Sequence, residues 1–189
     1  MFSQLKTAVS ALLVLTALTG VAYPLLVTGI AAVAFPREAA GSLINQRGKV
    51  VGSSLIGQEF TEPRYFWGRP SATTPAYNAS SSSGSNLGPS NPALLENAKA
   101  RIDALRSSDP TAKGPIPIDL VTSSGSGLDP HISPAAAYFQ AHRVSTARGI
   151  DEQKVRALIA QEAESRTAGL LGEGRVNVLL LNLALDQLR

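Results

Sequence analysis

The sequence predicts an α+β protein in which a single N-terminal transmembrane helix precedes one mixed α+β domain. Three observations carry this prediction. Only Lys6 is charged among the first 36 residues, although the chain holds 17 Lys+Arg and 14 Asp+Glu. The rest shows short helical and extended patterns broken by Gly, Ser and Pro. A length of 189 residues leaves room for one domain of ordinary size. We therefore expect an N-terminal tail and helix over 1–36 and a soluble domain over 37–189.

The apolar run covers residues 7–36, none of which is charged. A bilayer core about 30 Å thick needs roughly 20 helical residues, so the run is long enough to span once. Pro24 lies inside it and has no N–H to give, which predicts a kink or a helix end at residues 23–24.

A cleaved signal peptide is the alternative interpretation, because residues 32–34 are Ala-Val-Ala, a small-x-small pattern. A signal h-region has only about 7–15 apolar residues, and this run is roughly twice as long, so a retained anchor is favoured. Charge leaves the orientation open, since Lys6 precedes the run and Arg37, Arg47 and Lys49 follow it.

The domain begins with extended and irregular segments. Residues 49–57 predict one or two strands with turns, and the aromatic residues 65–67 are closed by a turn at 68–70. Burial of two of these rings is expected, with stacking of the cluster and Arg69 on a partner as the alternative. Five of the six residues 80–85 are serine, so residues 79–89 predict a long surface loop or a segment that a partner orders.

Three helix starts are marked by capping residues. Asn91 and Ser133 each precede a proline, and Asp151 begins a third helix. The second should end at Gly149, and Ile150 before the third should pack on it as a hydrophobic staple. The expected buried faces are Leu94, Leu95, Ala98, Ile102 and Leu105 in the first helix, and Val155, Leu158, Ile159 and Ala163 in the third.

Two later segments predict strands. Residues 116–122 are a strand candidate whose Pro117 favours an edge strand or a strand start. Residues 176–181 are almost continuously apolar, which predicts a strand buried on both faces, followed by a terminal helix over 182–188.

Composition and missing motifs exclude several classes of protein. The chain has no cysteine, which removes disulfides, thiolate nucleophiles and cysteine metal sites. Its basic residues are scattered among acids, so nucleic acid is not expected as a partner. Phosphate-binding, G-x-S-x-G hydrolase and zinc-protease motifs are absent, as is an Asp-Lys-Thr phosphorylation motif. One Ser-x-x-Lys match, at Ser3 and Lys6, lies in the N-terminal tail and is attributed to chance. One span and one small domain also exclude a multi-span transporter.

The richest polar stretch is residues 121–134. Small residues there would let backbone N–H groups approach an anion, and the following helix start would add its dipole. The favoured interpretation is a structural loop in which Asp129 and Ser133 cap their own backbone. The positions that would meet an anion are Ser124, Gly125, Ser126 and Gly127.

No reaction is indicated by the remaining polar residues. Asp129 and His131 are close in sequence, but His142 is the only other histidine and no third metal ligand has matching spacing. A hydrogen-bonded structural His131 is therefore favoured, with a hydrolase using a serine of residues 123–126 as the alternative. Glu162 and Glu164 are expected on a solvent-exposed helix face.

Taken together, the motifs resemble the C subunit of the Kdp potassium-transporting ATPase. Two blocks are the most recognisable. They are residues 119–134, which include Gly-Ser-Gly-Leu-Asp-Pro-His at 125–131, and Arg-Val-Asn-Val-Leu-Leu-Leu-Asn-Leu-Ala-Leu-Asp at 175–186. Earlier blocks agree in order, at 52–58, 65–72 and 84–92. One departure is the serine run at 80–83, which is longer than the usual loop of that family.

The resemblance implies a non-catalytic accessory subunit of a bacterial inner-membrane complex that imports K⁺ at the expense of ATP. The implied partners are an ATP-hydrolysing P-type subunit, a potassium-channel-like subunit, a small peptide subunit and membrane lipid. The implied topology is a cytoplasmic N-terminus with the domain in the periplasm. No metal and no tightly bound cofactor are implied. Any contact with ATP is implied only through the partner ATPase subunit.

The family is also described as a catalytic chaperone that raises the ATP affinity of the pump subunit, with residues 124–127 as a nucleotide contact. A periplasmic loop lies across roughly 30 Å of hydrocarbon from cytoplasmic ATP, so an indirect effect is expected. The alternative function is a membrane-anchored periplasmic binding module for a small anion or nucleotide.

Overall fold

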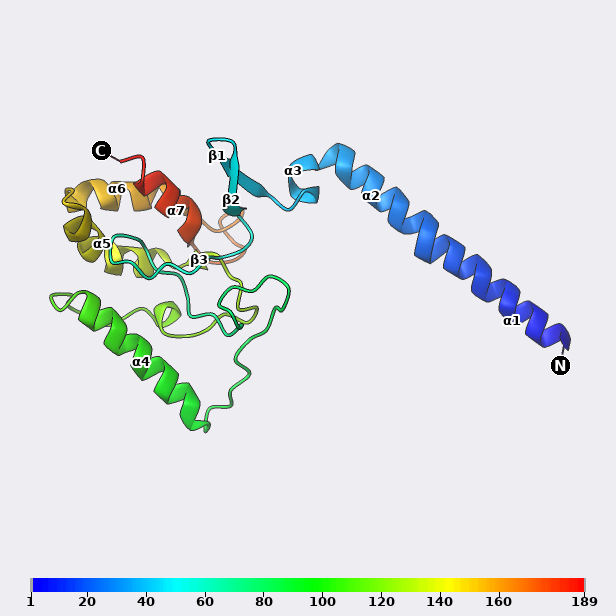
Figure 1. Ribbon diagram of the computed structural model, residues 1–189, viewed down its shortest axis with the longest axis horizontal. Helices are drawn as coiled ribbons and strands as arrows, with labels where there is room; N and C mark the ends of the chain where they lie inside the picture. Colours follow the sequence, from blue (N-terminus) through cyan, green and yellow to red (C-terminus); the bar gives the residue numbers. More distant parts are fainter. Residues whose placement is uncertain (1, 189) are drawn as a thin grey trace. The chain divides into compact units, whose positions relative to one another are not determined.

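Figure 1 shows the computed structural model of the chain, in which residues 2–188 are described. These residues form two compact units, the first ending at Leu43 and the second beginning at Ile44. Helices and short strands both occur in the second unit, as the predicted α+β class requires.

The first unit is dominated by one long apolar helix. It consists of α1 (Phe2–Leu15), the π-helical segment η1 (Thr16–Ala22) and α2 (Tyr23–Ala34), and the short helix α3 (Pro36–Ala39) follows. The first three run on without a break for 33 residues. Of the helices that the structure describes, this one is long and apolar enough to cross a membrane.

Pro24 does not end this helix. The N–H of Tyr23 donates to the carbonyl of Leu18, five residues back, which makes the turn before Pro24 wider than an α-turn. Pro24 follows in the first turn of α2, where it has no N–H to offer. Of the two predicted alternatives, a kink or a helix end, the helix end is not found, because the change of hydrogen-bond register in η1 accommodates the proline.

A hairpin of β1 (Leu43–Gln46) and β2 (Lys49–Ser53) follows, and all of it except Leu43 belongs to the second unit. The strand predicted to begin at residue 49 is confirmed as β2, whereas β1 was not predicted. Arg47 and Gly48 connect the strands with φ of 51° and 77°. Two successive positive φ values are those of a type I′ turn, whose twist matches that of paired strands.

The helices and the second sheet make up the rest of this unit. The second sheet is antiparallel with strand order β3-β5-β4, and Val176 of the central strand lies opposite both Ile132 and Ala163. The elements in chain order are α4 (Pro92–Ser108), the 3₁₀ helix η2 (Ile118–Leu120), β3 (His131–Ile132), α5 (Pro134–Arg148), α6 (Glu152–Glu162), β4 (Ala163–Glu164), β5 (Arg175–Asn177) and α7 (Val178–Leu185).

The three predicted helix starts are confirmed by their capping bonds. Side-chain oxygens of Asn91, Ser133 and Asp151 accept N–H groups of the first turns of α4, α5 and α6 at 3.0, 3.0 and 2.8 Å. Gly149 ends α5 with φ 66°, in the left-handed conformation that favours glycine.

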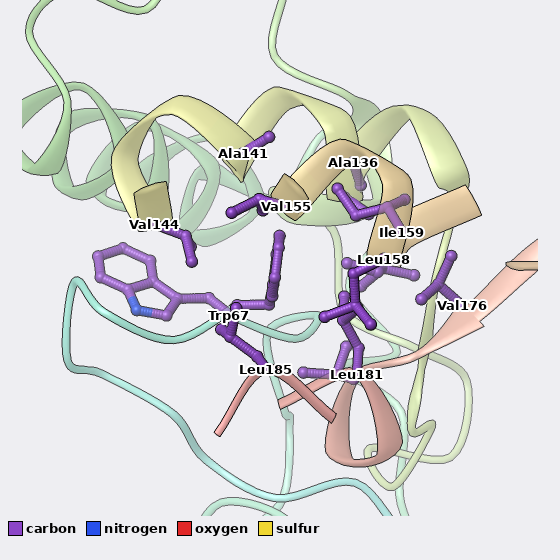
Figure 2. Packing of buried hydrophobic residues seen from close by; sticks show 14 of the residues in the cluster. Trp67, Ala136, Ala141, Val144, Val155, Leu158, Ile159, Val176, Leu181 and Leu185 are labelled. Atoms are coloured by element: carbon purple, nitrogen blue, oxygen red, sulfur yellow. The ribbon is translucent and has the colours of Figure 1, made fainter. Parts of the chain in front are cut away.

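The core lies between α5, α6, α7 and the central strand β5 (Figure 2). The predicted buried face of α6 is confirmed for Val155, Leu158 and Ile159. The predicted face of α4 is only partly correct, since Leu105 is buried but Leu95 is 72% exposed. Other labelled core residues in Figure 2 are Trp67, Ala136, Ala141, Val144, Val176, Leu181 and Leu185.

Three predicted assignments differ from the structure. Residues 116–122 hold η2 in place of a strand, because Pro115 and Pro117 have no N–H groups for a ladder. The strand predicted over 176–181 ends at Asn177, whose side chain accepts the Leu180 N–H at 3.1 Å and caps α7. Glu164 lies in β4, paired opposite Arg175, and not on a helix face.

Two buried carboxamides hold an irregular segment inside the core. Asn182 of α7 accepts the Phe66 N–H at 2.9 Å and donates to the Phe66 carbonyl at 3.0 Å. Gln140 of α5 accepts the Trp67 N–H at 2.8 Å and donates to the Trp67 carbonyl at 3.1 Å. Each amide thus satisfies both backbone groups of one residue, as a neighbouring strand would. The expected burial of two aromatic rings is confirmed for Phe66 and Trp67.

Asn182→Ala should destabilise the protein by about 2–4 kcal/mol, because it leaves two buried backbone groups of Phe66 unpaired and opens a small cavity. Urea unfolding of the detergent-solubilised chain, followed by circular dichroism, measures this. The matched control is Asn97→Ala on the exposed side of α4, which should change the unfolding free energy by less than about 0.5 kcal/mol. Equal effects of the two substitutions would contradict the pairing role.

Candidate functional site: the Gly/Ser loop

The Gly/Ser loop, residues 122–130, connects η2 to β3 and satisfies part of its own backbone. The hydroxyl of Ser124 accepts the Gly127 N–H at 2.9 Å, and that of Ser126 accepts the Leu128 N–H at 3.1 Å. Asp129 accepts the His131 N–H at 2.9 Å. These amides are engaged within the chain, as the structural interpretation of the loop predicted.

The serine-rich loop lies against the Gly/Ser loop. The carbonyl of Ser126 accepts the Ser83 N–H at 2.9 Å and the Ser82 hydroxyl at 3.1 Å. A Cβ on Gly84 would come within 2.9 Å of the Gly125 carbonyl oxygen, so the two backbones are in close contact. The loop at 79–89 is mostly exposed, as expected, but its docking was not predicted.

Arg69 fastens the Gly/Ser loop from the other side. Its guanidinium donates to the carbonyls of Thr122 and Ser123 at 3.4 and 3.1 Å. It also donates to Asp129 Oδ2 at 3.3 Å. Arg69 therefore acts within the domain, and the cations over the Trp67 ring are Arg101 and Arg143, at 5.2 and 4.3 Å from its centroid.

Asp129 is the charged centre of the loop. Partial burial acts to raise its pKa, but the hydrogen bonds from the ring and amide of His131 and the charge of Arg69 outweigh it and hold the pKa below its usual value. The carboxylate therefore stays ionised near neutral pH. His131 Nδ1 lies 3.3 Å from Asp129 Oδ1, the hydrogen-bonded structural arrangement that was favoured.

Tyr77 is a residue of this site that the sequence did not reveal. Its hydroxyl donates to the Arg69 carbonyl at 2.6 Å, and burial raises its pKa to about 12. Glycines make room for its ring and hydroxyl, since a Cβ on Gly57 would lie 2.4 Å from Tyr77 Cε1 and one on Gly68 would lie 2.6 Å from its oxygen. The only sequence signal for this placement was the pair of isolated glycines, Gly57 and Gly68, which lie 11 residues apart.

A cavity of about 420 Å³ opens beside the loop. Three of the four predicted site positions, Ser124, Gly125 and Ser126, line it together with Arg69. The fourth, Gly127, is buried with φ 69°, and its carbonyl accepts the Ser71 hydroxyl at 2.7 Å. The cavity has space for a small anion, although Arg69 is already bonded to the loop.

The residues considered for metal binding or hydrolysis are not brought together. His142 contacts Glu152 at 3.1 Å on the α5 and α6 side, whereas His131 contacts Asp129. Within residues 2–188 no group of three or more His, Asp or Glu is placed to hold a metal ion. Within residues 2–188, no hydrogen bond links a serine of 123–126 to His131. The structure therefore does not form the serine–histidine pair that the hydrolase alternative requires.

A family model described as "K+-transporting ATPase, c chain" matches residues 5–187. The chain belongs to the KdpC family. The "Potassium-transporting ATPase KdpC subunit" of Sorangium cellulosum is 62% identical over 190 residues and covers 100% of both chains. The protein of that name from Polaromonas naphthalenivorans is 64% identical over 186 residues, 98% of this chain and 95% of the relative.

Membership of the KdpC family confirms the resemblance inferred from the ordered sequence blocks. The match covers the apolar helix as well as the domain, so both units belong to the KdpC pattern. A nucleotide contact at residues 124–127 stays a prediction.

Gly127→Ala should destabilise the domain by about 2–4 kcal/mol, because the residue has positive φ and a new Cβ would meet the Ser83 carbonyl at 2.6 Å. Gly125→Ala is the matched control two residues away, exposed and with nothing within 4 Å of its Cβ. Thermal unfolding of the two variants compares them. A Gly127→Ala midpoint equal to that of the control would contradict the packing described for the loop.

Proposed function

We propose that the chain is the non-catalytic accessory subunit of a complex that imports K⁺ with high affinity at the expense of ATP. The observation that carries this proposal is the KdpC family match over residues 5–187. The relatives are named as subunits of a potassium-transporting ATPase, which supports a place beside other chains. The partners proposed are an ATP-hydrolysing P-type subunit, a potassium-channel-like subunit and a small peptide subunit.

The proposed topology places the N-terminus in the cytoplasm, the apolar helix in the inner membrane and the domain in the periplasm. Support comes from the 33-residue helix, which at 1.5 Å per residue is about 50 Å long and exceeds a hydrocarbon core of about 30 Å. A single helix does not enclose an ion path by itself, so the ions must pass through another subunit.

The proposed role is assembly and stabilisation of the complex. A membrane anchor keeps the domain at high effective concentration next to its partners, so contacts that are weak in solution become persistent. The domain supports such a role because its long irregular segments are fixed by side-chain bonds, including those of Arg69 and Tyr77. A surface that is ordered before binding loses less entropy on assembly.

We also propose that any effect on the ATP affinity of the hydrolysing subunit is indirect. With the domain in the periplasm, the Gly/Ser loop lies about 30 Å or more from cytoplasmic nucleotide. The engaged amides of Gly127 and Leu128 favour the same view. A binding module for a small anion or nucleotide remains the second candidate, supported by the cavity beside Ser124 and Arg69.

Deletion of the gene in a strain without other K⁺ uptake should abolish growth at micromolar K⁺, because the complex would not assemble into an active pump. Growth curves at micromolar and millimolar K⁺ measure this. The strain should grow normally at millimolar K⁺, and a plasmid copy of the gene should restore growth at micromolar K⁺. Normal growth of the deletion strain at micromolar K⁺ would refute the proposed function.

Topology is testable with alkaline phosphatase and green fluorescent protein fused after residue 189. Phosphatase activity without fluorescence is expected. Alkaline phosphatase becomes active only in the periplasm, whereas green fluorescent protein fluoresces in the cytoplasm and stays dark when the general secretory pathway exports it unfolded. The control pair carries the same reporters directly after Lys6, before the uncharged run that begins at Thr7, and should show the reverse result. A fluorescent C-terminal fusion would overturn the periplasmic placement and restore a direct ATP contact.

A further inference from the structure

The connection between β4 and β5 carries two adjacent leucines on the surface of the second unit. All of residues 164–173 are exposed, and Leu170 and Leu171 are 82% and 69% exposed. Leu170 is the most exposed large apolar side chain among the described residues of this unit. We call residues 167–172 the β4–β5 tip. Its leucines add almost nothing to the core, so folding alone does not account for two apolar side chains here.

Backbone hydrogen bonds hold the β4–β5 tip in one shape. The Thr167 N–H donates to the Leu171 carbonyl at 2.9 Å, and the Leu171 N–H donates to the Thr167 carbonyl at 3.0 Å. Between them the chain turns through Ala168 and Gly169, with φ of 53° and 73°. Ala168 is thus a non-glycine residue in the left-handed region, where its Cβ is crowded. Strained backbone of this kind clusters at functional segments, and here it closes the turn that presents Leu170.

The charges beside the tip are paired with one another. Arg166 donates to both carboxylate oxygens of Glu173 at 2.7 and 2.6 Å, and Arg175 donates to Glu164 at 2.9 Å. Residues 163–175 therefore carry two bases and two acids. This segment can approach an apolar surface without bringing an unpaired charge to it.

This charge balance favours a protein pocket over a lipid surface as the partner of the tip. Segments that bind anionic bilayers place free Lys or Arg side chains beside their apolar residues. Here Arg166 and Arg175 are engaged by acids, and the Glu173 side chain, directly after the tip, is 81% exposed. A fixed turn also suits a pocket of fixed shape, because little conformational freedom is lost on binding.

We propose that the β4–β5 tip docks into an apolar pocket on another subunit of the transporter. Leu170 and Leu171 fill the pocket, and the paired charges beside the tip lie at its rim. An apolar centre surrounded by a polar rim is the usual anatomy of a protein interface. This inference rests on the proposed function, because it requires that the chain works within a complex.

Cysteine labelling in the intact complex tests this proposal, because the chain has no cysteine of its own. Leu170→Cys introduces one thiol at the tip, and its reaction with a polar maleimide is followed on the gel band of this chain. The matched control is Leu95→Cys, at a 72% exposed position on α4. The thiol at position 170 should react about tenfold or more slowly in the complex than in the free subunit. The thiol at position 95 should react equally in both.

Photo-crosslinking identifies what covers the tip. An aliphatic diazirine amino acid at position 171 keeps the apolar character of Leu171, and the complex is purified through a tag on this chain. Position 171 should crosslink to another subunit of the transporter, identified by mass spectrometry. A crosslink only to lipid, or only to a second copy of this chain, would overturn the proposal.

Removal of both leucines measures their contribution to docking. Leu170→Ser combined with Leu171→Ser should raise the rate at which this chain dissociates from the immobilised complex about tenfold or more. The thermal midpoint of the free subunit should not fall, because these side chains bury little surface in the folded chain. Leu95→Ser is the control and should leave both the dissociation rate and the midpoint unchanged.

The outcomes separate two failures. If the subunits copurify but assembly protects position 170 no more than position 95, or the double substitution leaves the dissociation rate unchanged, the tip does not dock while the proposed function stands. If the double substitution lowers the midpoint of the free subunit and Leu95→Ser does not, the leucines are structural and the proposal is overturned. If no transporter subunit copurifies with this chain, the proposed function fails, and this inference fails with it.

Discussion

The pairing of two buried carboxamides with the backbone of Phe66 and Trp67 is the constraint on which the domain depends. Gln140 and Asn182 come from α5 and α7, so this pairing joins both helices to a segment with no regular structure of its own. Arg143 strengthens the junction by donating to Gln140 and lying over Trp67. Burial, and then the charge of Arg101, lower the pKa of Arg143 to about 10, which leaves it protonated at neutral pH. The rings and the cations thus form one packed unit.

The position of the Gly/Ser loop follows from that junction. Arg69 comes two residues after Trp67, and its guanidinium reaches Ser123 and Asp129. The Tyr77 hydroxyl donates a hydrogen bond to the Arg69 carbonyl. Several irregular segments are held by side chains in this way, which satisfies buried backbone groups without a large sheet. Such a domain offers fixed surfaces, and this property suits a subunit that works through contacts with other chains.

The candidate site was only partly predictable. The stretch around residues 124–127 was identified as a loop, with Asp129 and Ser133 as caps, because capping involves residues two or three apart. Arg69, Tyr77 and the docking of Ser83 were not assigned to it, since they lie more than 40 residues away in the sequence.

The sequence by itself determined the apolar helix, the starts of α4, α5 and α6 and the family, because charge, caps and ordered motifs are local properties of the chain. Only the tertiary structure decided the fate of residues 176–181, where an apolar run fits a strand and a buried helix equally well. Pairing with β3 and β4 made residues 175–177 a strand, and the Asn177 cap turned the rest into α7. Contacts between distant segments made that choice, and local periodicity does not contain them.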